Sequence, residues 1–158
     1  MESASTISSV IISNPGSPVR QLSVFLHNYV GSFLSLVKLL NANDITILGL
    51  SVQDSVELTL VRLVVSDPEK AEQTLTEQGL SCAARTIIVV EMREGVNDLG
   101  HALGALLSAE INIHHSYPLL VRPNDKPLLA LYVDDADVAA ESLNKSGFKV
   151  LTQGELSR

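Results

Sequence analysis

The chain has 158 residues, of which 46% are hydrophobic and 18% charged, and its net charge at pH 7 is −7. This composition supports a buried core and argues against disorder over most of the length. The acidic balance, with a pI near 4.9, argues against a nucleic acid partner and against binding to an anionic membrane surface, because both require a basic protein face.

The single cysteine, Cys82, excludes a disulfide within the chain and a cysteine-based zinc site. We therefore expect a reduced, cytoplasmic setting. No run approaches the roughly 18 apolar residues that a membrane helix needs. Residues 1–19 lack the basic start and the long apolar run of a signal peptide, and their Ser, Pro and Gly content predicts a loose leader.

The first half of the chain predicts the element order β-α-β-β-α-β. Residues 20–28 are β-rich, and apolar residues then recur at helical spacing at Phe33, Leu36, Val37 and Leu40. Ser66 or Asp67 caps the next helix, with Gly79 just past its end. The predicted elements after the first helix are strands over 45–52 and 56–65 with a turn at 53–55, a helix over 66–79 and a strand over 80–84.

The second half repeats this order. The helix exit "LLNANDITI" (39–47) returns as "LLSAEINI" (106–113), and Ile45 and Ile111 then correspond at an offset of 66 residues. The predicted elements are a strand over 85–94, a helix over 95–110, a strand over 111–121 bent near Pro118, a strand over 128–133, a helix over 134–147 and a strand over 148–152.

Each half is a split β-α-β unit with two helices on one face of an antiparallel sheet and an open opposite face. A unit of this size buries little surface alone, so the two units, or two chains, are expected to pair. An RNA-binding module of this shape carries aromatic side chains on its central strands and is basic, whereas this chain has 4% aromatic residues and is acidic. The first loop also has neither the cysteines of a metallochaperone nor the arginine of an acylphosphatase.

The stretches "HNYVGSFLSLVKLLNANDITI" and "REGVNDLGHALGALLSAEINI" resemble the loop, helix and helix exit of ACT domains, which are small regulatory modules that bind amino acids. The resemblance covers roughly residues 20–153, and the layout is similar to that of short stand-alone bacterial double-ACT proteins. It implies an α+β fold of two ferredoxin-like units in tandem, with a leader at 1–19, a first ACT domain at 20–85 and a second at 86–154.

The resemblance also implies a ligand site where each first strand meets its helix, because the helix N-terminus offers free N–H groups to a carboxylate. Gly31 allows close approach in the first loop, whereas Asn97 stands at the glycine position of the second, with Gly95 two residues earlier. The first loop is therefore expected to be the better site. The candidate ligand-binding residues are Asn28, Tyr29, Val30, Gly31, Ser32, Phe33, Glu94, Gly95, Val96, Asn97, Asp98 and Leu99.

The function that follows from the resemblance is that of an amino-acid sensor, a homodimer without cofactor or enzyme activity that modulates a metabolic enzyme or another partner. Since the candidate loops carry no basic side chain, a small or aliphatic amino acid is expected. Two alternatives remain open. One is a separate regulatory subunit of an amino-acid biosynthetic enzyme such as acetolactate synthase, and the other is a structural dimerisation module without ligand.

Four other features favour structural roles. His114 and His115 are adjacent on a strand, so their side chains are expected to point to opposite faces and not to chelate one metal ion. Cys82 is expected to be buried and inert, and His101 has no partner that would make it a general base. The acidic residues at the start of the last long helix are expected to cap it; they are Asp134, Asp135 and Asp137.

Overall fold

The computed structural model describes residues 16–157, so most of the predicted leader lies outside the described residues. The first unit begins with β1 at Val19. Its elements are β1 (Val19–His27), α2 (Ser32–Ala42), β2 (Ile47–Asp54), β3 (Leu58–Val65), α3 (Pro68–Glu77) and the first part of β4 (Ser81–Glu91). The second unit adds η1 (Gly95–Asp98), α4 (Leu99–Ser108), β5 (Ile113–Pro118), β6 (Leu128–Val133), α5 (Ala136–Lys145), β7 (Lys149–Val150) and the short α6 (Gln153–Leu156).

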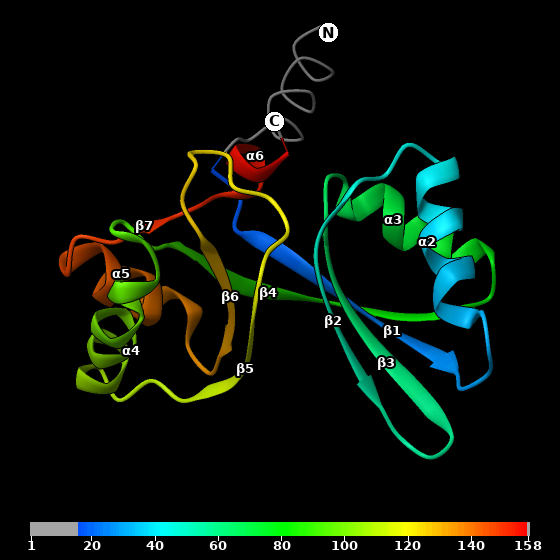
Figure 1. Cartoon of the computed structure of the whole chain (residues 1–158), viewed down its shortest axis with the longest axis horizontal. Coiled ribbons are helices and arrows are strands. Elements are labelled where there is room, and N and C mark those ends of the chain that lie inside the picture. The colour runs from blue at the N-terminus through cyan, green and yellow to red at the C-terminus, as the bar shows by residue number, and fades with distance from the viewer. Residues whose placement is uncertain (1–15, 158) are drawn as a thin grey trace, which may run out of the picture.

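The long strand β4 belongs to both units (Figure 1). Its first part, 81–87, pairs antiparallel with β1, and its last part, 88–91, pairs with β6 and β7. The prediction of two separate strands here was wrong, because the backbone runs through Arg85 without a turn. The predicted division after residue 85 falls inside this strand.

The strands form one curled sheet in the order β2-β3-β1-β4-β6-β5, with β7 beside β4. Within it, each unit has the antiparallel order expected of a ferredoxin-like βαββαβ fold, which confirms the predicted fold class. Figure 1 shows α2 and α3 on one side of the molecule and α4 and α5 on the other, with the strands between them. The sequence pattern did not predict α6, a single helical turn that begins with a capping box at Thr152 and Glu155.

Each pair of helices covers the outer face of its own half of the sheet. Leu22 and Leu63 pack with Leu36, Leu40 and Leu75 beneath α2 and α3. In the second unit, a separate core contains Val90 and Leu131 from the strands and Ala102, Leu106, Ala139 and Leu143 from α4 and α5. Within each of α2, α4 and α5 these residues are four apart, a spacing that places them on one face of the helix.

A third core fills the space between the two inner faces of the sheet, and it joins the units within one chain. It contains Val19, Leu48 and Val64 from the first unit, with Ile87 and Val89 from β4. The remaining members come from the second unit and the C-terminal helix; they are Tyr117, Leu128, Ala130, Leu151 and Leu156. Part of the sheet face that each unit's own helices do not cover is therefore buried against the other unit.

The repeated helix exits have the same geometry in both units. Asp44 and Glu110 both have φ near 58°, in the left-handed region that non-glycine residues rarely adopt. The next residue then bonds back to the helix, since Ile45 N–H donates to the Leu40 carbonyl and Ile111 N–H to the equivalent carbonyl of Leu106, each at 3.0 Å. The sequence repeat thus corresponds to a repeated structural corner.

Candidate functional site

The first candidate loop is fixed to the neighbouring hairpin. The Asn28 backbone N–H donates to the Glu57 carbonyl at 3.3 Å, and its Nδ2 donates to the Ser55 carbonyl at 3.1 Å. These bonds place the end of β1 beside the turn between β2 and β3. Asn28 therefore orients the loop and does not cap the following helix.

Helix α2 begins at Gly31 without a side-chain cap. Gly31 occupies the N-cap position with φ 88°, and no side chain bonds to the first turn. Tyr29 and Val30 precede it as exposed side chains, while Ser32 is buried. An uncapped helix N-terminus presents free backbone N–H groups and the positive end of the helix dipole, which favour a carboxylate.

A pocket of about 460 Å³ lies beside this helix start. Four leucines and six residues with polar groups line it, namely Leu26, His27, Tyr29, Ser32, Ser35, Leu36, Lys38, Leu39, Gln78 and Leu80. Tyr29 and Ser32 are predicted site residues, whereas the others were missed. The signal was present for two of them, because Ser35 and Lys38 follow Gly31 at helical spacing and so share its side of α2.

Lys38 changes the expectation for the ligand. The preference for a small or aliphatic amino acid depended on the absence of basic side chains from the loops. The pocket contains Lys38, which comes from the second turn of the helix and not from the loop, and it also contains His27. A pocket with a basic group and apolar side chains can accept an anionic group together with a hydrocarbon chain.

The second candidate loop has a different backbone. Gly95 has φ 77°, whereas Asn97 lies in the short 3-10 helix η1 and does not have a positive φ. Asn97, which the sequence repeat sets at the glycine position, therefore does not adopt the left-handed conformation of Gly31. Gly95 supplies this conformation two residues earlier, and the intervening turn of η1 leads directly into α4.

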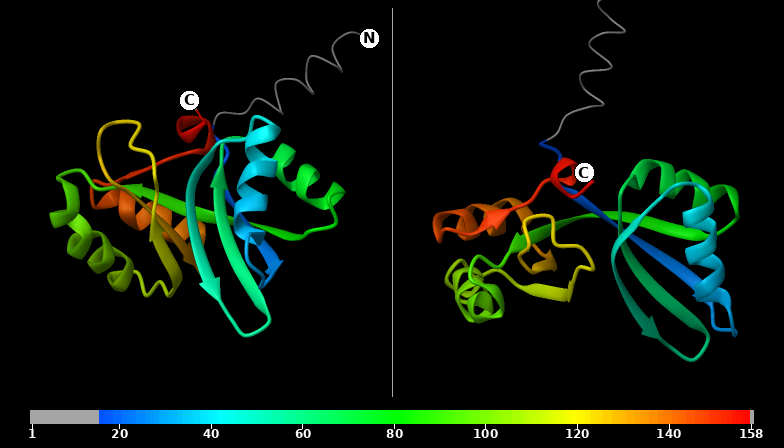
Figure 2. Two further views of the ribbon diagram at one scale, coloured as in Figure 1. Left: turned by 45° about the vertical axis from the view of Figure 1, so that its right-hand side comes forward. Right: turned by 45° about the horizontal axis from the view of Figure 1, so that its top comes forward.

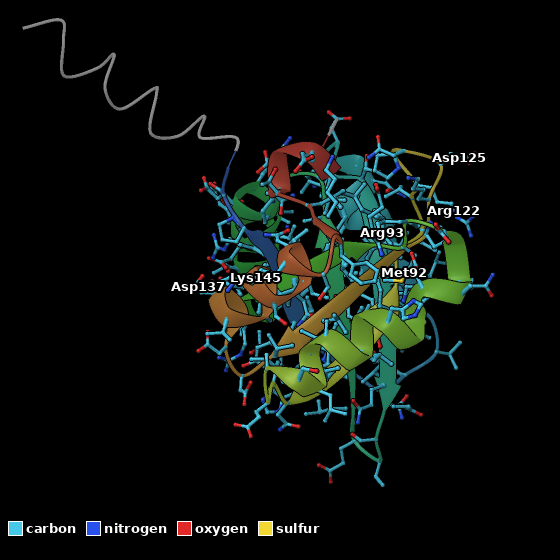
Figure 3. The ribbon with its side chains drawn as sticks, turned by 90° about the vertical axis from the view of Figure 1, so that its left-hand side faces the viewer. Met92, Arg93, Arg122, Asp125, Asp137 and Lys145 are labelled. Atoms are coloured by element: carbon cyan, nitrogen blue, oxygen red, sulfur yellow. The ribbon has the colours of Figure 1, made fainter. Side chains whose placement is uncertain are left out.

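A carboxylate lies at the second helix start, although no side chain bonds to the first turn of α4. Asp98 is 5% exposed, and its Oδ2 accepts the Glu94 backbone N–H at 2.9 Å. Arg93 Nε lies 3.8 Å from Oδ2 of Asp98, and His101 Nδ1 lies 3.5 Å from Oδ1. Figure 3 shows Arg93 just after the end of β4. The Glu94 hydrogen bond, above all, lowers the pKa of Asp98, with further contributions from His101 and Arg93.

The other predicted features have structural roles. Asp135 caps α5, as expected, by accepting the Val138 N–H at 3.1 Å, while Asp134 accepts the Asn112 N–H at 3.2 Å. Cys82 is half-buried, and burial raises its pKa to about 11, which disfavours the reactive thiolate.

Between residues 16 and 157, no three His, Cys, Asp or Glu side chains are grouped so that they could hold a metal ion. In the same part of the chain, no helix has the length and apolarity to span a membrane.

Comparison with solved structures supports the fold. A protein from Bacteroides thetaiotaomicron superposes with a TM-score of 0.82 at 21% sequence identity, over 92% of this chain and 99% of that chain. The ligand-free regulatory subunit of aspartate kinase from Thermus thermophilus gives a TM-score of 0.61 at 12% identity, over 82% of this chain and 91% of that chain. The corresponding subunit from Thermus flavus gives 0.55 at 13% identity, over 83% and 94%. A search of curated proteins gives no match.

The family comparison covers the same region as the sequence resemblance. The model of the ACT domain pair matches residues 17–158, nearly the whole chain. This match confirms the resemblance drawn from the two helix exits, and ACT domains are regulatory modules. The chain belongs to the ACT domain pair family.

Proposed function

We propose that this protein is a regulatory amino-acid sensor that binds its effector at the start of α2. The observation that carries the proposal is the uncapped helix N-terminus at Gly31 beside the pocket that contains Lys38. The ligand carboxylate would bind the free N–H groups of the first helical turn. Asn28 Oδ1 is the proposed acceptor for the ligand amino group, and the leucines of the pocket receive the side chain.

The second loop is the weaker site in this proposal. Asp98 already places a carboxylate at the start of α4, where it accepts the Glu94 N–H. A second carboxylate would meet electrostatic repulsion there. We therefore propose one effector site per chain, at Asn28–Phe33, while Glu94–Leu99 serves as a structural turn.

Regulation requires the effector to favour one arrangement of the protein or of its partner. We propose that residues 20–85 and 86–154 act as the two ACT units and that the protein modulates a cytoplasmic metabolic enzyme without catalysing a reaction itself. The likeness in fold to regulatory subunits of aspartate kinase favours a second function of the same kind, a separate regulatory subunit of a biosynthetic enzyme. If the protein co-purifies with a large enzyme from its native host, this result favours the regulatory subunit over the independent sensor.

We also propose that the protein forms a homodimer through α4. The outward side of α4 and the preceding η1 expose an apolar row of Val96, Leu99, Leu103 and Leu107, with Leu107 77% exposed. Contiguous apolar surface of this kind marks an interface. Light scattering of the purified chain tests the assembly, and Leu107→Glu is expected to convert the dimer to a monomer. A wild-type monomer would contradict the assignment.

Two glycine variants test the effector site. Gly31 and Gly95 both have a positive φ, and a Cβ added to either meets no atom within 4 Å. Gly31→Ala and Gly95→Ala should therefore cost similar stability, about 1 kcal/mol each, through backbone strain. Only Gly31→Ala brings a methyl group to the proposed carboxylate position.

The twenty amino acids are screened by thermal shift at millimolar concentration, followed by calorimetry of any that raise the melting temperature. We expect at least one amino acid to bind the wild-type chain and the Gly95→Ala variant, and to bind Gly31→Ala at least tenfold more weakly. A Lys38→Gln variant should weaken acidic ligands most. If no amino acid binds, or if both alanine variants bind equally, the proposed site is wrong and the purely structural alternative is favoured.

A further inference from the structure

Basic side chains flank β1 on the inner face of the sheet. Arg62 on β3 lies opposite Ser23, and Arg85 on β4 lies opposite Gln21. Residues directly opposite each other in an antiparallel pair share a face. Gln21 contacts Tyr117 of the second unit, so this is the face turned toward that unit and away from α2 and α3.

The second unit brings two histidines to the same place. A register shift between Ile113 and His115 interrupts the alternation of β5. The rings of His114 and His115 both contact Tyr132, with centroids 5.2 and 5.1 Å away. The expectation that these two histidines diverge to opposite faces was therefore wrong, and the bulge is the physical reason.

Arg85 and Arg62 join this group from the first unit. The Arg85 guanidinium carbon lies 5.9 Å from the centre of the Tyr132 ring. Arg62 acts electrostatically on His115, and the pKa of His115 is lowered by burial, by Arg62 and by His114. We call Arg62, Arg85, His114 and His115 the inner basic cluster. Arg62 and His115 are partly buried, while Arg85 and His114 are exposed, so solutes can reach the cluster.

No acidic side chain neutralises this cluster within residues 16–157. The ion pairs of the described residues engage other cations, namely Arg20, Arg93, His101, Lys145 and Lys149. The Arg62 guanidinium instead donates to a neutral partner, Gln53 Oε1, at 3.2 Å. The protein has 18 acidic residues and 11 lysines and arginines, so an unpaired basic group of this size is not a consequence of its composition.

We propose that the inner basic cluster binds a compact oxyanion, the phosphate or carboxylate groups of a small metabolite, between the two units. Arginine suits this role because its planar guanidinium donates two parallel hydrogen bonds to such groups. The bound anion relieves the mutual repulsion of Arg62 and Arg85, which are charged at pH 7. It also contacts β3 and β4 of one unit and β5 of the other, so its binding stabilises their present arrangement.

This site is separate from the proposed amino-acid site. The inner basic cluster lies on the inner face of the sheet, whereas Gly31 and Lys38 belong to α2 on the outer face. Failure of one site therefore leaves the other testable. Lys38→Gln should affect amino-acid binding and leave anion binding unchanged.

The test uses the full chain at pH 7 and equal ionic strength, titrated calorimetrically with inorganic phosphate and, separately, with citrate. We expect saturable binding of at least one anion. Phosphate binding alone indicates a phosphate ester as the natural ligand, and citrate binding alone indicates a polycarboxylate. Arg62→Gln and Arg85→Gln should each weaken binding at least tenfold.

Arg122→Gln is the matched control, because it removes the same charge at a position outside the inner basic cluster. Arg122 is exposed on the loop between β5 and β6, close to Asp125 in Figure 3. This variant should bind as the wild type does. If Arg62→Gln fails to fold, Arg62→Lys keeps the charge, loses the bidentate geometry, and should still weaken binding. Absence of saturable binding by either anion, or an equal loss in all the arginine variants, overturns the proposal.

Discussion

Gly49 on β2 lies directly against Leu119, which follows β5, and this contact closes the curled sheet. The two residues form an isolated antiparallel bridge, and the Leu120 N–H donates to the Leu48 carbonyl at 2.8 Å. Figure 2 shows from two further directions how the loop after β5 approaches β2. The edge strand of one unit thus meets the edge strand of the other, so the relative position of the units depends on a backbone contact as well as on the third core.

This contact explains why glycine suits position 49 better than a residue with a side chain. A Cβ built there overlaps Cδ2 of Leu119 and comes within 3.4 Å of its Cα. Gly49→Ala should therefore lower the free energy of unfolding by about 1–3 kcal/mol through overpacking. Gly104→Ala is the control, because a Cβ in that α4 position meets no atom, and it should stabilise the protein by up to about 1 kcal/mol. Urea unfolding checks both, and equal effects would contradict the packing argument.

Sequence periodicity predicted most of the secondary structure, because apolar residues in each half recur at helical spacing in some segments and at every second residue in others. Leu36 and Leu40 recur at helical spacing and are buried beneath α2, whereas Val61 and Leu63 are buried two residues apart on β3. The continuity of β4 was not predicted, since a strand shared by two units differs from two adjacent strands only in the absence of a turn. The residues around Arg85 contain no glycine or proline that would indicate a turn, and the lack of such residues could have indicated a continuous strand.

The candidate site was predicted less completely than the fold. The loop and Gly31 follow from the repeat, because the helix exits fix the register of both units. Lys38 was missed because only the loop was considered, although the helix that follows it presents the pocket. The cluster at His115 depends on a β-bulge and on contacts with Gln21, 94 residues away in sequence, and local pattern contains no information about such contacts.

The left-handed corner at Glu110 offers a stabilising substitution. Glu110 has φ 58° at the C-terminal end of α4 and is exposed. Glycine adopts this conformation without strain, so Glu110→Gly should raise the free energy of unfolding by about 1 kcal/mol. Glu141→Gly, in the interior of α5, should lower it by about the same amount, because glycine is unfavourable inside a helix. Thermal unfolding of the two variants gives the comparison, and destabilisation by Glu110→Gly would be inconsistent with strain at this corner.

A buried hydrogen bond joins the two units through Gln21 and Tyr117. The Tyr117 hydroxyl donates to Gln21 Oε1 at 2.6 Å, and Gln21 is 1% exposed. Tyr117→Phe should cost about 0.5–1.5 kcal/mol, the net value of one hydrogen bond, because His115 Nε2 remains 3.2 Å from Gln21 Oε1. Gln21→Leu should also destabilise the protein, and the double variant should cost less than the sum of the two single ones. A double-mutant cycle measured in urea tests this coupling, and strictly additive effects would show that the bond contributes nothing across the interface.

His115 makes the stability of the protein sensitive to mild acid. Burial, then Arg62 and His114, hold its pKa below the ordinary value of 6.5 in the folded state. The unfolded chain therefore takes up a proton at His115 more readily than the folded chain does. The folded state favours the neutral imidazole, and the stability that this preference provides is complete above pH 6.5 and is lost as the pH falls below 6.5. His115→Gln should reduce the drop in the free energy of unfolding between about pH 7.5 and pH 5.5, and Arg62→Gln should reduce it less, because it removes only one of the causes. Urea unfolding at the two pH values gives these differences, and an unchanged drop in His115→Gln would assign the acid sensitivity to other groups.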